Sequence, residues 1–267
     1  MLWTNPKNSN ARFQNQPRDV LICLNCGLVT LDISKINERM LQDYYQTFNP
    51  FEKPGILPEG HKKMRYEQFE WISKNLPESS EIRSVCDIGC GSGYLMKIFK
   101  DKHYNVTGID YSPLMIKHIR DNYKINAVQG RFNNESFKEN FDLITCSNVI
   151  EHLIDPKDEI KIMSNILSDN GYLFIEVPDT EFPVSNTIVD VISFEHITHF
   201  TKGTLCRILE NFNLKKFMNN DKITFTQKLH PVYRAIQKTR KNLKKEKSLI
   251  SFVGAPWTLL IYMLNAR

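Results

Sequence analysis

Hydrophobic and polar positions along the chain follow two rhythms. Residues 64–76 place Met64, Phe69 and Ile72 on one face, which predicts a helix that ends before Pro77. From residue 82 onward, short apolar runs alternate with helical patterns, with predicted strands at 84–88, 105–109, 127–129, 141–147 and 171–177 and predicted helices at 94–100, 113–122 and 157–167. This alternation predicts an α/β fold, in which a mostly parallel sheet carries helices on both faces.

The two ends of the chain follow other patterns. Residues 1–60 read as irregular, because they carry several prolines and no sustained period. After a helix at 202–211, a basic helix at 230–247, a strand at 249–253 and a helix at 258–264 are predicted. That last strand and helix cannot close a sheet alone, so they either add to the main domain or begin a second, truncated Rossmann-like unit. We therefore divide the chain into residues 1–60, 61–228 and 229–267.

Composition indicates a globular protein. The chain has 267 residues, of which 41% are hydrophobic and 24% are charged, enough for one full domain and a smaller part. No apolar run approaches the roughly 20 residues that a membrane-spanning helix needs. The first residues lack the apolar core of a secretion signal. Six cysteines are too few for a disulfide scaffold in a chain of this length, so we expect a reduced, cytoplasmic protein.

The positive charge is concentrated in one segment. The net charge is +5, and residues 234–247 contain seven basic residues and one acidic residue. The rest of the chain is therefore near neutral. A nucleic-acid partner would have to bind this one segment, which reads rather as the solvated face of a linker helix, so we do not expect one.

A glycine-rich turn follows the predicted strand at 84–88. Asp87 precedes Gly89, Gly91 and Gly93 in the pattern D-x-G-x-G-x-G, and Asp110 ends the next strand, where a carboxylate can bind ribose hydroxyls. Dinucleotide sites use G-x-G-x-x-G and place a pyrophosphate there. A carboxylate at position 87 would repel a pyrophosphate, whereas it could pair with an ammonium group.

On these residues the chain resembles the class I S-adenosylmethionine-dependent methyltransferases, whose first motif is (D/E)-x-G-x-G-x-G. The resemblance continues through residues 141–153 and 170–178 and covers the chain from Tyr66 to Phe217. It implies a Rossmann-like methyltransferase fold with a mostly parallel, seven-stranded sheet. It also implies that S-adenosylmethionine is the cofactor.

The resemblance assigns roles to individual residues. It implies that the three glycines form the turn beside the methionine part of the cofactor, and that Asp87 places the amino group. Asp110 would hold the ribose. Further candidates for cofactor contact are the residue beside that aspartate, two adenine candidates and two residues lining the cleft, namely Tyr111, Phe132, Asn133, Ser147 and Asn148.

The acceptor side has a second resemblance. Residues 195–200, with sequence Glu-His-Ile-Thr-His-Phe, are similar to the E-H-(I/L)-x-x-F segment of deoxysugar C-methyltransferases, which act on keto-sugar nucleotides. This implies that His196 is the catalytic base, with Glu195 beside it and His152 facing the cleft. The alternative is that His196 and His199 hydrogen-bond locally while Phe200 fills the core.

The function expected from these resemblances is carbon methylation of a sugar nucleotide or a surface-polysaccharide precursor. Three alternatives stay open: O-methylation of a sugar or quinol-type hydroxyl, methylation of RNA, and cofactor binding without turnover. The partner we expect is therefore a small molecule. Nothing in the sequence predicts the oligomeric state.

A cysteine pair near the N-terminus raises the question of zinc. Cys23-x-x-Cys26-Gly27 is similar to half of the zinc ribbon that many sugar C-methyltransferases carry. A structural zinc site takes four ligands, so the pair either binds zinc with further ligands or remains as two thiols. The other cysteines, at positions 86, 90, 146 and 206, read as packing residues.

Overall fold

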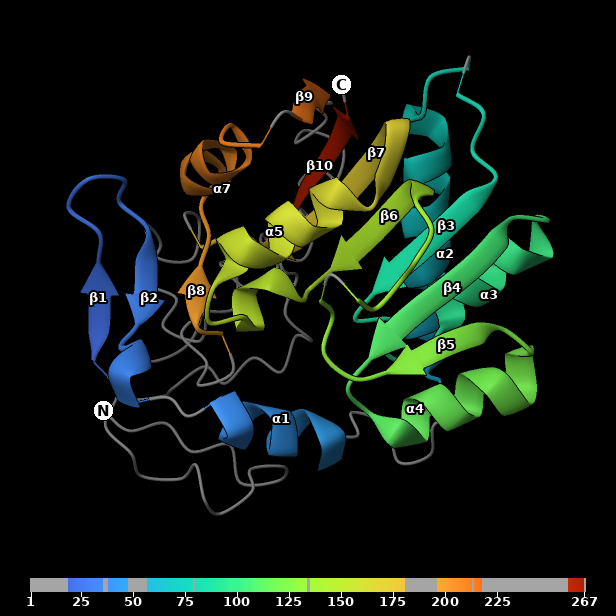
Figure 1. Cartoon of the computed structure of the whole chain (residues 1–267), viewed down its shortest axis with the longest axis horizontal. Coiled ribbons are helices and arrows are strands. Elements are labelled where there is room, and N and C mark those ends of the chain that lie inside the picture. Colours follow the sequence, from blue (N-terminus) through green and yellow to red (C-terminus); the bar gives the residue numbers. More distant parts are fainter. Residues whose placement is uncertain are drawn as a thin grey trace, which may run out of the picture.

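The computed structural model describes residues 19–35, 38–47, 57–78, 80–133, 135–180, 196–212, 214–217 and 259–266. Among them, the largest unit is a twisted sheet with helices on both sides, and a small three-stranded sheet lies beside it (Figure 1). The predicted α/β class is therefore confirmed.

The large sheet has the strand order β5-β4-β3-β6-β7-β10-β9. Five neighbouring strands are parallel, namely β3 (Ser84–Ile88), β4 (Asn105–Asp110), β5 (Asn126–Gln129), β6 (Phe141–Ser147) and β7 (Leu167–Pro178). Strand β10 (Leu259–Ala266) pairs antiparallel with β7, and β9 (Leu214–Phe217) pairs antiparallel with β10. The chain passes from β3 out to β5 and then returns to β6 on the other side of β3, so the strand order reverses between β3 and β6.

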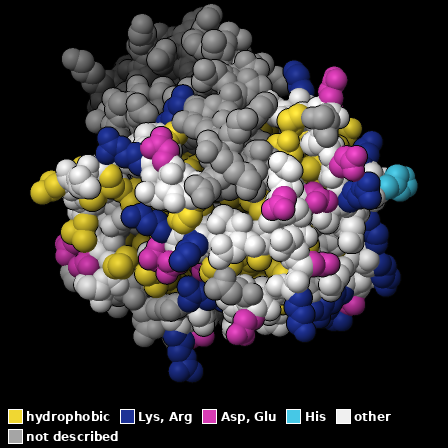
Figure 2. Space-filling view, turned by 45° about the horizontal axis from the view of Figure 1, so that its top comes forward, with side chains coloured by type: hydrophobic (Ala, Val, Ile, Leu, Met, Phe, Trp, Pro, Cys, Tyr) yellow, Lys and Arg dark blue, Asp and Glu magenta, His cyan; other side chains and the backbone are white. Residues whose placement is uncertain are grey.

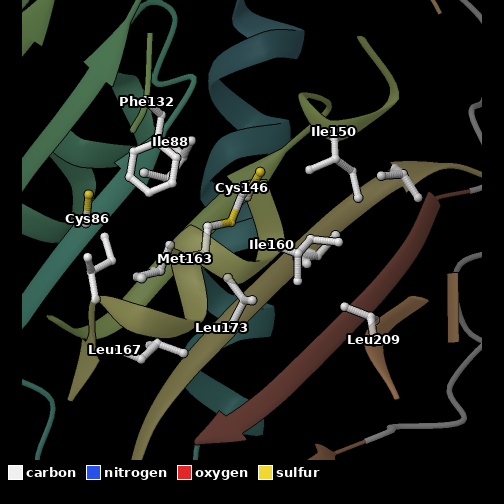
Figure 3. Close-up of a cluster of buried hydrophobic side chains, with 14 of the residues drawn as sticks. Cys86, Ile88, Phe132, Cys146, Ile150, Ile160, Met163, Leu167, Leu173 and Leu209 are labelled. Carbon is white, nitrogen blue, oxygen red and sulfur yellow. The ribbon is translucent and has the colours of Figure 1, made fainter. Parts of the chain in front are cut away.

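Alternation along the strands divides the core into two layers. Val85 and Leu143 pack with α2 (Glu59–Asn75), α3 (Tyr94–Asp101), α4 (Pro113–His118) and η2 (Ile119–Tyr123) on one face. Cys86 and Ile144, one position further along each strand, pack on the other face with η3 (Ile150–His152), α5 (Pro156–Asn165) and α7 (Lys202–Leu209). Figure 3 shows this second layer, where Ile160 and Met163 of α5 lie over Cys146 and Leu173 of the sheet.

One predicted helix is wrong. We expected a helix at 258–264, whereas residues 259–266 form strand β10, which pairs residue by residue with β7 from Leu259 opposite Pro178 to Asn265 opposite Tyr172. A short apolar run suits either a helix or a buried strand, and the unpaired edge of β7 decides between them. The predicted basic helix at 230–247 and the strand at 249–253 lie outside the described residues.

The N-terminal part is more regular than expected. It contains β1 (Val20–Ile22), β2 (Val29–Leu31), η1 (Ile33–Lys35) and α1 (Glu38–Thr47). Strand β2 pairs with β1 on one side and with β8 (Thr198–His199) on the other. These strands are too short for a periodic signal, and pairing with a segment more than 160 residues away stabilises them.

The described surface carries charges of both signs. Lys and Arg side chains are interspersed with Asp and Glu on the face that Figure 2 shows. The basic segment 234–247 lies outside the described residues. Of the helices that the structure describes, none is both long enough and apolar enough to cross a membrane.

Candidate active site

The glycine turn after β3 has a left-handed backbone at each of its three glycines, with φ of +67° at Gly89, +51° at Gly91 and +70° at Gly93. A Cβ at position 89 would lie 2.3 Å from Val149 Cγ2, and one at position 93 would lie 2.4 Å from Ile119 Cγ1. A Cβ at position 91 would meet no atom within 4 Å. Two glycines thus permit close packing, whereas Gly91 leaves its backbone open to the space above the turn.

Asp110 ties the end of β4 to this turn. Its Oδ2 accepts a hydrogen bond from Gly91 N at 2.8 Å, and its Oδ1 accepts one from Ser112 N at 2.8 Å. Burial raises the pKa of Asp110, and these two N–H groups oppose that rise. Each carboxylate oxygen can accept a further bond, so the side chain can also bind a pair of hydroxyl groups.

A cavity of about 280 Å³ opens beside this turn, at the carboxyl ends of β3, β4, β5 and β6. Strand ends at which the strand order reverses are the usual place for a ligand in such sheets. Seven of the predicted site residues line the cavity, namely Gly89, Gly91, Asp110, Tyr111, Phe132, Asn148 and His152.

The other predicted cofactor residues lie outside the lining. Asp87 is buried in β3, where its Oδ1 accepts a hydrogen bond from Thr145 Oγ1 at 2.7 Å, and burial raises its pKa to about 6. Ser147 is also buried, and its Oγ accepts a hydrogen bond from Gln68 Nε2 at 2.7 Å. Asn133 is exposed, and its Oδ1 accepts from the backbone N–H of Glu135 in the turn after β5. Gly93 packs against Ile119.

Sequence reasoning missed three lining residues that precede the glycine motif. Tyr45 of α1 and His61 and Arg65 of α2 all line the cavity. The ring of Tyr45 stacks on that of Tyr111, with 6.4 Å between the ring centroids. It also meets the ring of His152 edge-on, with 5.6 Å between the centroids. These side chains belong to helices that the tertiary fold brings across the strand ends, so no local pattern marks them.

The histidines predicted on the acceptor side do come together. The ring centroids of His152 and His196 lie 4.8 Å apart, and those of His196 and His199 lie 6.5 Å apart. Burial, with a smaller contribution from the neighbouring His152 and His199, lowers the pKa of His196 to about 3. His152 lines the cavity, whereas His196 lies behind it and is buried. Glu195 lies outside the described residues.

The N-terminal hairpin holds this histidine segment. Val29 and Thr30 of β2 pair with His199 and Thr198, and Leu31 N donates to Ile197 O at 2.8 Å. Phe200 is fully buried in the core, as the packing alternative expected. The ring nitrogens of His199 have no hydrogen-bond partner among the described residues, so the local bonding expected of that alternative is not found for this histidine.

Two groups of side chains contain atoms of the kind that serve as metal ligands. Glu151, His152 and His196 each bring one such atom to within 4.8 Å of the others. Burial raises the pKa of Glu151 to about 8, and its carboxylate oxygens have no hydrogen-bond partner in the described part of the chain. Cys23 and Cys26 lie in the β1–β2 turn, where backbone N–H groups of Cys26 and Asn25 lower the pKa of Cys23. Within the described ranges, no third His, Cys, Asp or Glu joins this pair at metal-binding distance.

The chain is similar to known methyltransferases. A family model described as "Methyltransferase domain" matches residues 61–217, and a model of uroporphyrinogen decarboxylase matches the shorter stretch 183–267. A ubiquinone biosynthesis O-methyltransferase of Xylella fastidiosa is 28% identical over 54% of this chain and 63% of its own length. Another of the same name, from Idiomarina loihiensis, is 26% identical over 46% and 53%. The chain thus spans little more than half the length of these relatives.

Solved structures show the same fold. Magnesium protoporphyrin IX methyltransferase from Synechocystis, solved with bound S-adenosylhomocysteine, has a TM-score of 0.56 at 12% identity over 86% of this chain and all of that one. An S-adenosylmethionine-dependent methyltransferase from Clostridium acetobutylicum has a TM-score of 0.51 at 14% identity over 76% and 91%. The sheet order, the glycine turn and the family model, which matches more than half of the residues, all indicate a methyltransferase domain. The chain therefore belongs to the methyltransferase domain family and has the Rossmann-like fold of class I S-adenosylmethionine-dependent methyltransferases.

Proposed function

We propose that this protein transfers a methyl group from S-adenosylmethionine to a hydroxyl group of a small-molecule acceptor. The observation that carries the proposal is that Gly91, Asp110 and His152 line one and the same cavity. Gly91 and Asp110 are suited to the cofactor, and His152 is the member of the His152, His196 and His199 group that lines the cavity.

The residues suit the cofactor chemically. The open side of Gly91 leaves room for a ligand against the backbone, and Asp110 can accept from the two ribose hydroxyls. Phe132 and Tyr111 offer apolar surface to the adenine ring. Arg65 lines the same cavity and supplies a positive charge for the carboxylate of the methionine part.

The sulfonium of the cofactor is already activated, so the protein has to orient the acceptor and remove one proton. His152 is the proposed base, because its ring lines the cavity and neutral imidazole accepts protons near neutral pH. The buried His196 lies against that ring and would hold its orientation. In the methyl-transfer step, the hydroxyl oxygen attacks the methyl carbon and the carbon–sulfur bond breaks. S-adenosylhomocysteine leaves, and the hydroxyl proton passes to His152.

The relatives support oxygen as the methylated atom. Both relatives described above are named as O-methyltransferases of ubiquinone biosynthesis, which makes a quinol-type hydroxyl the first acceptor to test. Carbon methylation of a keto-sugar nucleotide remains the competing prediction. It depends on Glu195 and His196, of which only His196 is among the described residues.

A turnover assay distinguishes these possibilities. The purified protein is incubated with S-adenosylmethionine labelled with ¹³C in its methyl group, in the presence of catechol, a quinol or a keto-sugar nucleotide. We expect S-adenosylhomocysteine to form with a hydroxyl acceptor and NMR to show an O–CH₃ signal. A C–CH₃ product would support the carbon alternative. Tight cofactor binding without turnover on any acceptor would indicate a non-catalytic binding protein.

The same assay tests the base. His152→Gln keeps the size of the side chain but removes the imidazole, so we expect at least a hundredfold loss of turnover with cofactor affinity within threefold of the original. His103→Gln, at a histidine in the turn between α3 and β4, is the matched control. Normal turnover by His152→Gln would rule out the proposed role of His152.

A further inference from the structure

A chain of hydrogen bonds runs from the cavity into the sheet beneath it. Arg65 lines the cavity, and its Nη1 donates to Gln68 Oε1 at 2.9 Å, one turn further along α2. Gln68 is buried, with 7% of its surface exposed. The arginine that faces the cavity is therefore held by a residue that does not reach it.

The amide of Gln68 is itself fixed in orientation. Its Nε2 donates to Ser147 Oγ at 2.7 Å and to Glu176 Oε2. Ser147 ends β6, and Glu176 lies near the end of the adjacent strand β7. Because a carboxylate accepts hydrogen bonds, the amino end of the amide has to face Glu176, and its oxygen then faces Arg65.

The charges in this region favour the same arrangement. Burial raises the pKa of Glu176, while the charge of Arg65 and the hydrogen bonds from Ser147 and Gln68 oppose that rise. The charge of Arg65 acts in the same direction on the buried Asp87. The bond to Gln68 uses one of the five N–H groups of the guanidinium, which leaves others for an anion in the cavity.

We propose that Gln68 and Glu176 are positioning residues for the cofactor: through the Gln68 amide they orient Arg65 toward the carboxylate of the methionine part. This inference rests on the proposed function, since it requires a cofactor with an amino-acid head. Gln68 is separated from Ser147 by 79 positions and from Glu176 by 108 positions in the sequence.

The test compares two ligands that differ in the amino-acid head, whose carboxylate Arg65 would bind. S-adenosylhomocysteine carries the amino-acid head, whereas 5′-methylthioadenosine has the same adenosine and thioether without it. We expect Gln68→Met to raise the calorimetric Kd for S-adenosylhomocysteine about tenfold and to leave that for methylthioadenosine within twofold. Ser147→Ala removes one of the two acceptors of Gln68, and we expect a smaller loss with the same selectivity.

A double variant shows whether Gln68 acts through Arg65. Arg65→Met should weaken S-adenosylhomocysteine binding selectively, and adding Gln68→Met to it should change the Kd by less than twofold. Glu70→Gln, at an exposed position of the same helix, is the control and should leave both affinities unchanged.

Each contrary result has a distinct meaning. The positioning role is wrong if Gln68→Met weakens the binding of both ligands equally. It is also wrong if Gln68→Met weakens the binding of S-adenosylhomocysteine as strongly in the Arg65→Met background as in the original protein. In both cases the proposed function stands. If the unaltered protein binds neither ligand, the proposed cofactor is wrong, and the inference fails with it.

Discussion

At the scale of single residues, the three glycines of the turn after β3 differ in what a side chain would meet. Substitution of Gly91 by alanine would place a methyl group in the open space of the cavity. The left-handed backbone would cost about 1–2 kcal/mol of folding free energy, which a domain of this size tolerates. We expect Gly91→Ala to fold and to bind S-adenosylhomocysteine at least tenfold more weakly by calorimetry.

The matched control is Gly93→Ala. Its methyl group would collide with Ile119 inside the core, so we expect a larger loss of thermal stability than for Gly91→Ala. If Gly91→Ala binds the ligand with unchanged affinity, the space above Gly91 is not the cofactor site.

Asp87 gives a prediction for pH. Burial raises its pKa from 3.8 to about 6, so the folded protein holds this proton more tightly than the unfolded chain does. Stability is therefore lost as pH rises from about 4 to about 6, by up to about 3 kcal/mol, and is constant above that. Asn at position 87 does not titrate and can still accept from Thr145.

We expect the unfolding free energy of the original protein, relative to Asp87→Asn, to fall by up to this amount between pH 4 and pH 7. Urea denaturation at both pH values measures the difference. A difference that stays constant with pH would mean that Asp87 keeps an ordinary pKa in the fold.

At the scale of elements, the pairing of β2 with β8 places the N-terminal hairpin beside the segment that contains His196, on the proposed acceptor side. Strand β2 is central in its small sheet, and Thr30 pairs with Leu21 on one side and with Thr198 on the other. Leu31→Pro would remove the backbone N–H that donates to Ile197 O, and with it a hydrogen bond between β2 and the segment that leads into β8. We expect methyl transfer to fall at least tenfold because the His196 segment loses its support, while S-adenosylhomocysteine affinity changes less than threefold.

Leu24→Ser is the control at the tip of the same hairpin, where the side chain is 98% exposed. It should leave both turnover and affinity unchanged. Unaltered turnover by Leu31→Pro would show that the hairpin does not support the acceptor side, and a parallel loss of cofactor affinity would show a general defect in folding.

At the scale of the whole molecule, β10 joins residues 259–266 to the large sheet. It lies between β7 and β9, so removal of residues 259–267 would leave the long strand β7 unpaired along that edge. Exposed edges of this kind associate with other chains. We expect the shortened protein to melt at least 5 °C lower and to form oligomers in size-exclusion chromatography.

Hydrogen exchange checks the same element in the intact protein. Amides of residues 260–265 should exchange as slowly as those of β6, because a strand paired on both sides opens with the sheet. Fast exchange there, together with an unchanged melting temperature after the truncation, would contradict the pairing of β10 with β7 and β9.

Local patterns predicted the parts of the fold that local energetics determine. Apolar runs of strand length located all five parallel strands, and the glycines with Asp110 located the turn and the cavity beside it. Prediction failed where partners lie far apart in the chain. The hairpin at 20–31 depends on β8, and the identity of β10 depends on the free edge of β7.

The sequence by itself determined the α/β class, the D-x-G-x-G-x-G turn and the acid that follows the next strand, because glycine conformation and strand periodicity are properties of neighbouring residues. The tertiary structure alone decided which side chains share the cavity. It placed Tyr45 and Arg65 over the strand ends, buried Asp87 and Ser147 beneath them, and put His152 in front of His196. The reason is physical: burial and the distance between groups arise only when elements pack against one another, and these two quantities decide which groups can touch a ligand.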